Sequence, residues 1–187
     1  MEMKEKIMEA VIELFNEKGC HFTLDDIEKK LRISRKTVYK YFLSKNDILK
    51  SIIDDAHEGI HVRQQEIFRD PHMGVKEKLF AALTIEARHE DKINLRRLYE
   101  MEQDAPEVFT YFMNAYEDNW GIIEALLRQG MEEGILRPMN VELIRRMLAD
   151  GMETCYHGDF LIRNNLQYKE ALHQVVDIVM EGLVTGK

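Results

Sequence analysis

The chain has 187 residues, 45% of them hydrophobic, which is enough for one or two domains with a packed core. Its formal net charge of −8 argues against indiscriminate binding to nucleic acid. No uncharged run approaches membrane-spanning length, no signal-peptide pattern is present and the two cysteines are isolated, so we expect a cytoplasmic protein without a membrane partner.

Apolar residues recur at helical spacing along the chain, without strand patterns, repeats or low-complexity segments, so we predict an all-α fold. The first helix covers the N-terminal region, and two short helices follow Thr23 and Ser34. A long helix begins near Ser44 and ends before Pro71. The remaining helices are expected at about 75–89, 94–103, 106–131, 141–157 and 167–183.

The two short helices begin with opposite charge. Thr23 is a good N-cap and Asp26 follows at capping-box spacing, so acidic residues meet the positive end of the helix dipole. Ser34 is also a good N-cap, but Arg35 and Lys36 follow it, and like charge at that end costs about 0.3–1 kcal/mol per residue. An external anion such as a DNA phosphate would reverse this penalty, so the second short helix is predicted to read DNA.

Basic charge is concentrated around this second short helix. Residues 28–50 hold eight Lys or Arg and two acids, a local net of +6, whereas residues 51–187 carry fifteen basic and twenty-five acidic side chains. The apolar spacing leaves a solvent-facing set that can donate to phosphate oxygens: Arg35, Lys36, Thr37, Tyr39, Lys40 and Tyr41. The alternative is an ordinary charged helical surface.

This stretch resembles the TetR-like transcriptional regulators over about the first fifty residues. The matching positions are Ile7, Ala10, Val11, Leu14, Phe15, Gly19, Thr23, Ile27, Leu31, Ile33-Ser34, Val38-Tyr39, Tyr41-Phe42, Ser44-Lys45 and Leu49. Lys30, Arg32 and Lys36 stand where the family usually has small residues. The resemblance implies a three-helix helix-turn-helix head at residues 1–50 and a helical ligand-sensing and dimerisation bundle at 51–187.

Carried over position by position, the resemblance also implies roles for individual residues. Base-edge contacts would come from Arg35, Lys36 and Thr37. Phosphate contacts would come from Thr23, Ser34, Tyr39, Tyr41 and Lys45.

The last two helices carry more apolar surface than one buried face needs. In the family this pair docks against its symmetry mate as a four-helix bundle, and a twofold dimer is what a helix-turn-helix protein needs to read two half-sites. The predicted homodimer interface is Ile144, Leu148, Met152, Leu172, Val175, Val176, Val179 and Leu183. The alternative is that both helices complete the core of a monomer.

An aromatic stripe is predicted on the helix after Pro106. Its members, spaced at i, i+3, i+4, i+7 and i+11, are Phe109, Phe112, Met113, Tyr116 and Trp120. Such stripes are more often core than pocket, but the resemblance implies a site for a small-molecule effector there. Weaker candidates for the same site are Tyr99, Glu102, Met152 and Tyr156. The effector is unknown, and no cofactor is indicated.

The string His57-Glu58-Gly59-Ile60-His61 satisfies the zinc-protease pattern H-E-x-x-H. Gly59 weakens the helix, and neither a third ligand nor a strand-rich domain accompanies the string. Neither a Ser/His/Asp set nor a glycine-rich phosphate loop is evident, so we expect no catalytic and no metal-binding residues, with a regulatory metal site at His57 and His61 as the alternative.

The sequence therefore predicts a homodimeric, ligand-responsive regulator that binds a double-stranded operator and, as is usual in the family, represses. One alternative is a DNA-binding helical protein whose body makes protein contacts without sensing a small molecule. A remote alternative is a metalloenzyme that uses His57 and His61.

Overall fold

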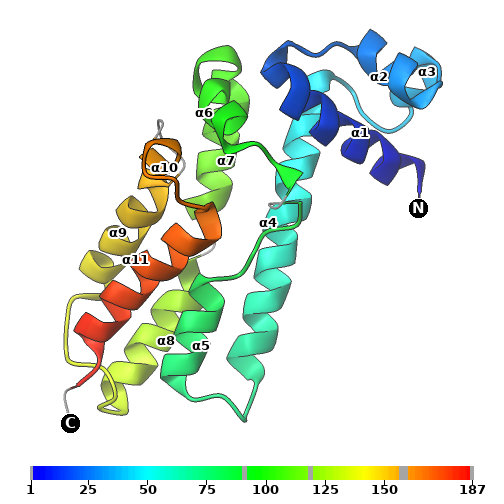
Figure 1. Ribbon diagram of the computed structural model, residues 1–187. Helices are drawn as coiled ribbons and strands as arrows, with labels where there is room; N and C mark the ends of the chain where they lie inside the picture. Colours follow the sequence, from blue (N-terminus) through cyan, green and yellow to red (C-terminus); the bar gives the residue numbers. More distant parts are fainter. Residues whose placement is uncertain (1, 90–91, 118–119, 156–159, 186–187) are drawn as a thin grey trace. The chain divides into compact units, whose positions relative to one another are not determined.

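The computed structural model describes residues 2–89, 92–117, 120–155 and 160–185, and within these ranges it confirms the all-α prediction (Figure 1). The only β-type pairing among them is a single antiparallel bridge between Leu136 and Val184. In chain order the elements are α1 (Met3–Lys18), the 3-10 turn η1 (Gly19–His21), α2 (Leu24–Leu31), α3 (Arg35–Val38), α4 (Lys45–Arg69), α5 (Val75–Leu83), α6 (Leu95–Asp104), α7 (Pro106–Glu117), α8 (Gly121–Glu132), α9 (Val141–Thr154), α10 (Phe160–Arg163) and α11 (Tyr168–Leu183). None of the helices in the described ranges is both long and apolar enough to cross a bilayer.

The chain folds into two compact units. The head unit comprises Met1–Glu58 and Arg88–Glu117, and the body unit comprises Gly59–Ala87 and Asp118–Lys187. The long helix α4 contributes to both. Helices α6 and α7 thus belong to the head unit by their contacts, whereas the sequence-based division into functional domains at residue 50 stays a prediction.

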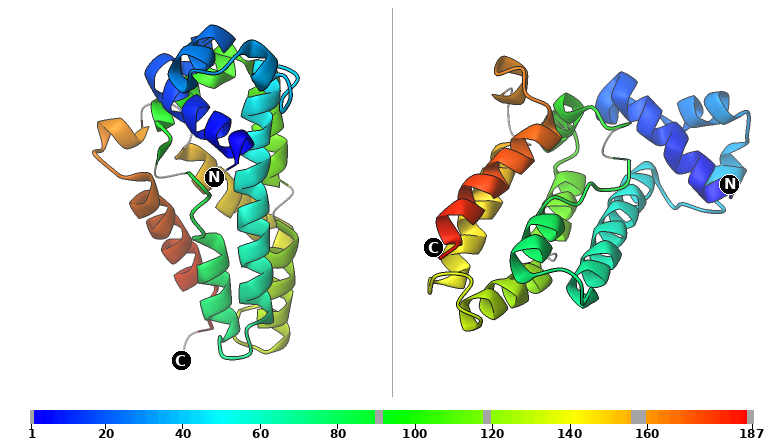
Figure 2. Two further views of the ribbon diagram at one scale, coloured as in Figure 1. Left: turned by 90° about the vertical axis from the view of Figure 1, so that its right-hand side faces the viewer. Right: turned by 60° about the horizontal axis from the view of Figure 1, so that its bottom comes forward.

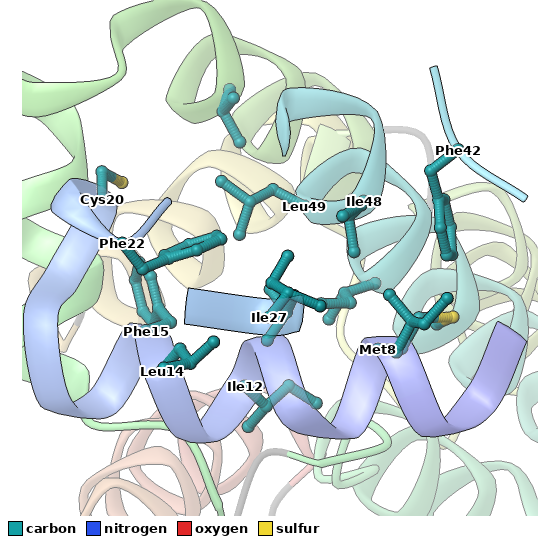
Figure 3. Packing of buried hydrophobic residues seen from close by; sticks show 14 of the residues in the cluster. Met8, Ile12, Leu14, Phe15, Cys20, Phe22, Ile27, Phe42, Ile48 and Leu49 are labelled. Carbon is teal, nitrogen blue, oxygen red and sulfur yellow. The ribbon is translucent and has the colours of Figure 1, made fainter. Parts of the chain in front are cut away.

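The core of the head forms where α1 to α4 bury their apolar faces against one another (Figure 3). Ile27 of α2, Val38 of α3 and Phe42 after it are buried together with residues of α1. These are the positions that the helical spacing predicts, because residues three and four apart lie on one face of a helix. Helices this short are not stable in isolation, so α2 and α3 are stabilised by the apolar residues that they bury against α1.

Helix α6 is tied to the end of α1 by polar contacts between segments about eighty residues apart. The Arg97 guanidinium donates to the carbonyl oxygens of Asn16 at 3.3 Å and Glu17 at 2.8 Å. The backbone N–H of Asn94 donates to Oδ1 of Asn16 at 2.8 Å. The two bonds from Arg97 satisfy carbonyl groups that the last turn of a helix leaves unpaired, and all three bonds explain why α6 belongs to the head unit.

Arg32 ends α2 in the left-handed conformation, with φ of 55°. Its backbone N–H donates to the carbonyl oxygen of Glu28, as in a helix C-cap. Glycine is favoured at such positions because it has no Cβ, which agrees with the small residue that the TetR resemblance leads us to expect here.

In the body unit, α5 lies against α8, and α9 lies against α11 (Figures 1 and 2). The helices α9 and α11 approach closely at Gly151, where an added Cβ would lie 2.7 Å from Cγ1 of Val175. Val175 therefore packs within its own chain.

Two predicted helices differ in the structure. The helix expected at 106–131 is described as α7, which ends at Glu117, and α8, which begins at Gly121; residues 118–119 lie outside the described part of the chain. The helix expected at 75–89 ends at Leu83, before a stretch that includes the β-branched residues Thr84 and Ile85. The short α10 was not predicted.

Candidate nucleic-acid interface

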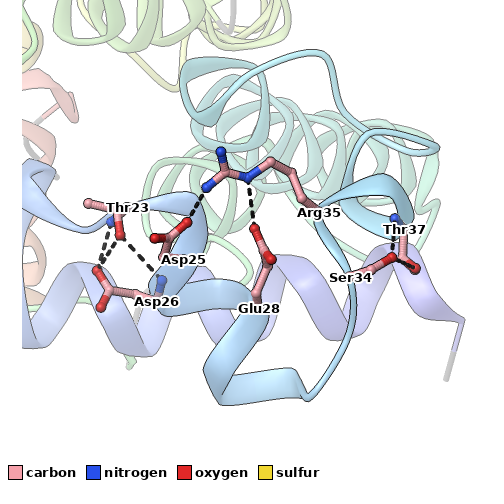
Figure 4. A network of polar contacts seen from close by, with 7 residues as sticks. All are labelled: Thr23, Asp25, Asp26, Glu28, Ser34, Arg35 and Thr37. Atoms are coloured by element: carbon pink, nitrogen blue, oxygen red, sulfur yellow. Dashed lines mark hydrogen bonds and ion pairs between the residues drawn. The ribbon is translucent and has the colours of Figure 1, made fainter.

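Helix α2 begins with the predicted capping box (Figure 4). Thr23 Oγ1 accepts the N–H of Asp26 at 3.3 Å, and the Thr23 N–H donates to Asp26 Oδ2 at 2.8 Å. Lys18 of α1 donates to the same carboxylate at 2.6 Å. The hydrogen bond from Lys18, followed by those from the Thr23 N–H and hydroxyl, lowers the pKa of Asp26 from 3.8 to about 2.

We expect this cap to give the protein a distinct acid sensitivity. Because the Asp26 pKa is lower in the folded than in the unfolded state, its carboxylate contributes stability above about pH 4, and that contribution is lost as the pH falls toward 2. The free energy of unfolding of Asp26→Asn should therefore lie below that of wild type at pH 6 and converge with it near pH 2, in urea titrations. Lys18→Met should weaken the same pH dependence. A constant difference between wild type and Asp26→Asn from pH 6 to 2 would refute this role.

Helix α3 is a single turn that presents the predicted reading residues. Ser34 caps it, because its Oγ accepts the N–H of Thr37 at 3.2 Å and lies 3.0 Å from the Thr37 hydroxyl. Val38 is buried and anchors the turn in the core of the head. The side chains that remain exposed around it are basic or aromatic: Arg35, Lys36, Tyr39, Lys40 and Tyr41. This surface suits phosphate and base-edge contacts.

Within this surface, the orientation of the Arg35 side chain is fixed by two contacts with acidic residues (Figure 4). Its Nε donates to Glu28 Oε1 at 2.8 Å, and its Nη2 donates to Asp25 Oδ1. Both acids lie on α2, and the Glu28 hydrogen bond is the main cause that raises the pKa of Arg35. Sequence reasoning missed both partners. The signal that points to them is their i, i+3 spacing, which places them on one face of α2.

Lys45 makes contacts within the head, and its predicted role as a phosphate contact stays a prediction. Its ammonium group donates to the carbonyl oxygen of Cys20 and lies 5.2 Å from the centroid of the Phe22 ring. It therefore joins the start of α4 to η1 inside the head, and replacing it would disturb the fold as well as any contact with DNA.

Comparison with known proteins decides what this head is. Residues 7–52 match the family model described as bacterial regulatory proteins, tetR family. The head is a TetR-family DNA-binding domain. Through this domain the chain is similar to DNA-binding transcriptional regulators of that family.

Relatives of the TetR-like chain match over nearly its whole length. The uncharacterized HTH-type transcriptional regulator YvaF of Bacillus subtilis (strain 168) is 21% identical, and the match covers 99% of this chain and 97% of that protein. The fatty acid degradation regulator FadR from Bacillus halodurans is 18% identical with a TM-score of 0.76, covering 97% of both chains. FadR from Bacillus subtilis, solved in complex with stearoyl-CoA, is 23% identical with a TM-score of 0.68, covering 98% of both chains. At these identities the structural matches show a shared fold.

The predicted effector residues are divided between the two units of the TetR-like chain. Phe109 and Phe112 pack against the core of the head, with ring centroids 6.4 Å apart. Trp120 precedes α8 and is buried in the body unit, so the expected stripe does not run along one helix. Met113 is partly buried, Met152 is buried and Glu102 is exposed, while the side chains of Tyr99, Tyr116 and Tyr156 lie outside the described part of the chain.

The body unit also contains a partly open cleft of about 300 Å³ between α5 and α11. The cleft is lined by Lys76, Glu77, Phe80, Asp177, Met180 and Glu181, none of which belongs to the predicted aromatic set. A binding role for that set stays a prediction.

Most of the predicted dimer-interface residues lie in the core of the chain itself. Those that are buried are Ile144, Leu148, Met152, Leu172, Val176 and Leu183. Val175 packs against Gly151, and Val179 is partly buried. The apolar side chains that α9 and α11 do expose are Leu143 and Met147, each 53% exposed, and Ile178, 73% exposed. The predicted interface residues thus lie mostly on faces that the chain itself buries, and their role in a dimer stays a prediction.

The H-E-x-x-H string lies within α4. His57 is partly buried and His61 is exposed. Across the described ranges, three or more His, Cys, Asp or Glu side chains nowhere gather in a way that could hold a metal ion.

Proposed function

We propose that this TetR-like chain is a cytoplasmic repressor that binds its operator as a homodimer and is released by a small hydrophobic ligand. The observation that carries the proposal is the helix-turn-helix head, with a basic, exposed α3 built onto a helical body. Such a head reads one half-site, so high affinity for an operator calls for a second copy.

The exposed apolar residues of α9 and α11 support the homodimer. Leu143, Met147 and Ile178 protrude from two helices that pack against each other. A twofold axis through this surface would pair each helix with its own copy, as in an isologous interface. Burial of these side chains in a dimer would stabilise it by about 25 cal/mol for each Å² of apolar surface removed from water.

The contacts between α6 and α1 support control of the head by a ligand. Through Arg97, α6 holds the carbonyl groups of Asn16 and Glu17 at the end of α1, whose other residues form the core of the head. A ligand that favours a different position of α6 would change the support of α1. Its effect on DNA binding is limited by its difference in affinity for the two states.

A fatty acyl-CoA is the first ligand class to test, because FadR from Bacillus subtilis was solved with stearoyl-CoA. The operator is first selected from random duplexes. Stearoyl-CoA should then lower operator affinity by about 5- to 150-fold, the usual range of coupling, and saturating operator should lower stearoyl-CoA affinity by the same factor. Trp120, the only tryptophan, provides the fluorescence signal.

Arg97→Ala is the variant that separates ligand binding from coupling. It should keep the Trp120 response but reduce the effect of ligand on DNA, whereas Arg63→Ala, which removes an exposed ion pair with Glu66 in the body unit, should change neither. If ligands alter Trp120 fluorescence and leave operator affinity unchanged, ligand release fails and the body serves protein contacts instead.

A further inference from the structure

Two acids of α2 hold Arg35 by one edge of its guanidinium group. Nε and Nη2 form the side edge of the group, and they donate to Glu28 and Asp25 respectively. The two carboxylates are separate acceptors three residues apart on α2, so they constrain the guanidinium in both position and rotation (Figure 4).

The end of the group, formed by Nη1 and Nη2, still has donors available. Nη1 points away from both carboxylates in Figure 4 and makes no hydrogen bond within the described residues. The Arg35 side chain is 51% exposed. Nη1 and the second hydrogen of Nη2 together offer two parallel N–H donors, and this pair matches O6 and N7 of guanine in the major groove.

We propose that Asp25 and Glu28 are positioning residues that orient Arg35 to read one guanine in each half-site. The proposal rests on the proposed function, in which the surface around α3 meets the operator. A long side chain held in place before binding loses less conformational freedom on binding, so the contact gains selectivity. The two negative charges also weaken the attraction of the head to phosphates, which lowers its affinity for all sequences. The difference in affinity between sequences then depends more on contacts with the bases.

A different role for the same contacts makes the opposite prediction. If Asp25 and Glu28 merely competed with DNA for Arg35, neutralising them would strengthen specific binding and keep or raise the preference for guanine. If they position Arg35, neutralising them strengthens binding to all sequences but weakens that preference. Base preference and general affinity must therefore be measured separately.

The test uses the full-length protein and the selected operator, with every base pair substituted in turn at one salt concentration. Wild type should prefer guanine at one position of each half-site by about ten-fold or more. Arg35→Ala should abolish that preference, because it removes the donors to O6 and N7. The double variant Asp25→Asn/Glu28→Gln should reduce the preference at least three-fold, leave the other positions unchanged and bind a scrambled duplex more tightly.

A matched control removes an acid elsewhere on the head. Glu13 pairs with Lys30 at 2.8 Å and does not contact Arg35. Glu13→Gln should therefore raise affinity for scrambled DNA while the guanine preference stays at the wild-type value. Asp25→Asn alone should lose part of the preference, and Asp25→Glu, which keeps the carboxylate, should retain more of it. Thermal unfolding of each variant verifies that the head is folded.

An unchanged or increased guanine preference in the double variant would overturn the positioning role, as would an Arg35→Ala variant that still selects guanine. These results differ from a failure of the proposed function itself. In that case the wild-type protein would enrich no sequence from the random duplexes.

Discussion

Ile178→Glu should yield a folded monomer that has lost most of its affinity for the operator. Ile178 is 73% exposed in the single chain, so a carboxylate there costs little until a second copy covers it. In the dimer that carboxylate would be buried without a partner, which is strongly unfavourable. Losing the second half-site should lower operator affinity by about 100-fold or more. Sedimentation and DNA titration measure the two effects.

A control for added charge is available on α4 in the body unit. Val62 is also exposed, so Val62→Glu introduces the same charge away from α9 and α11. This variant should remain a dimer and bind the operator almost as wild type does. If Ile178→Glu sediments with wild type, the surface formed by Leu143, Met147 and Ile178 is not the interface.

Val176→Glu, two positions earlier on α11, should unfold the body instead. Val176 is fully buried within its own chain, on a different face of the helix from Ile178. An unpaired carboxylate at that position costs several kcal/mol, a large part of the 5 to 15 kcal/mol that typically separates folded from unfolded states. We expect loss of cooperative urea unfolding and of helical circular dichroism.

Val176→Ala provides the comparison, because it removes volume without adding charge. It should stay folded and dimeric, with a lower urea midpoint. A folded, monomeric Val176→Glu would reverse the assignment and place Val176 at the interface between subunits, as its apolar pattern alone suggested.

Local chemistry made much of the head predictable from the sequence. The caps at Thr23 and Ser34 depend on side chains and N–H groups three residues apart, so sequence spacing determines them. The burial of Ile27, Val38 and Phe42 likewise follows from helical periodicity. These contacts are decided by neighbours in the chain.

The features that sequence reasoning missed depend on how separate helices meet. Both α9 and α11 carry apolar residues around much of their circumference, and spacing alone does not reveal which face the chain buries itself. The contacts of Arg35 with Asp25 and Glu28 require the angle between α2 and α3. The contacts of Lys45 with Cys20 and Phe22 require α4 to meet η1, twenty-five residues away in sequence.

Selection of bound sequences from random duplexes, followed by native mass spectrometry of the complex, tests the central claim most directly. A homodimeric operator-binding protein predicts two inverted half-sites whose centres are about 10 base pairs or a multiple of that apart, with two chains on each duplex. Recovery of unrelated sequences, or of a single half-site occupied by one chain, would contradict it.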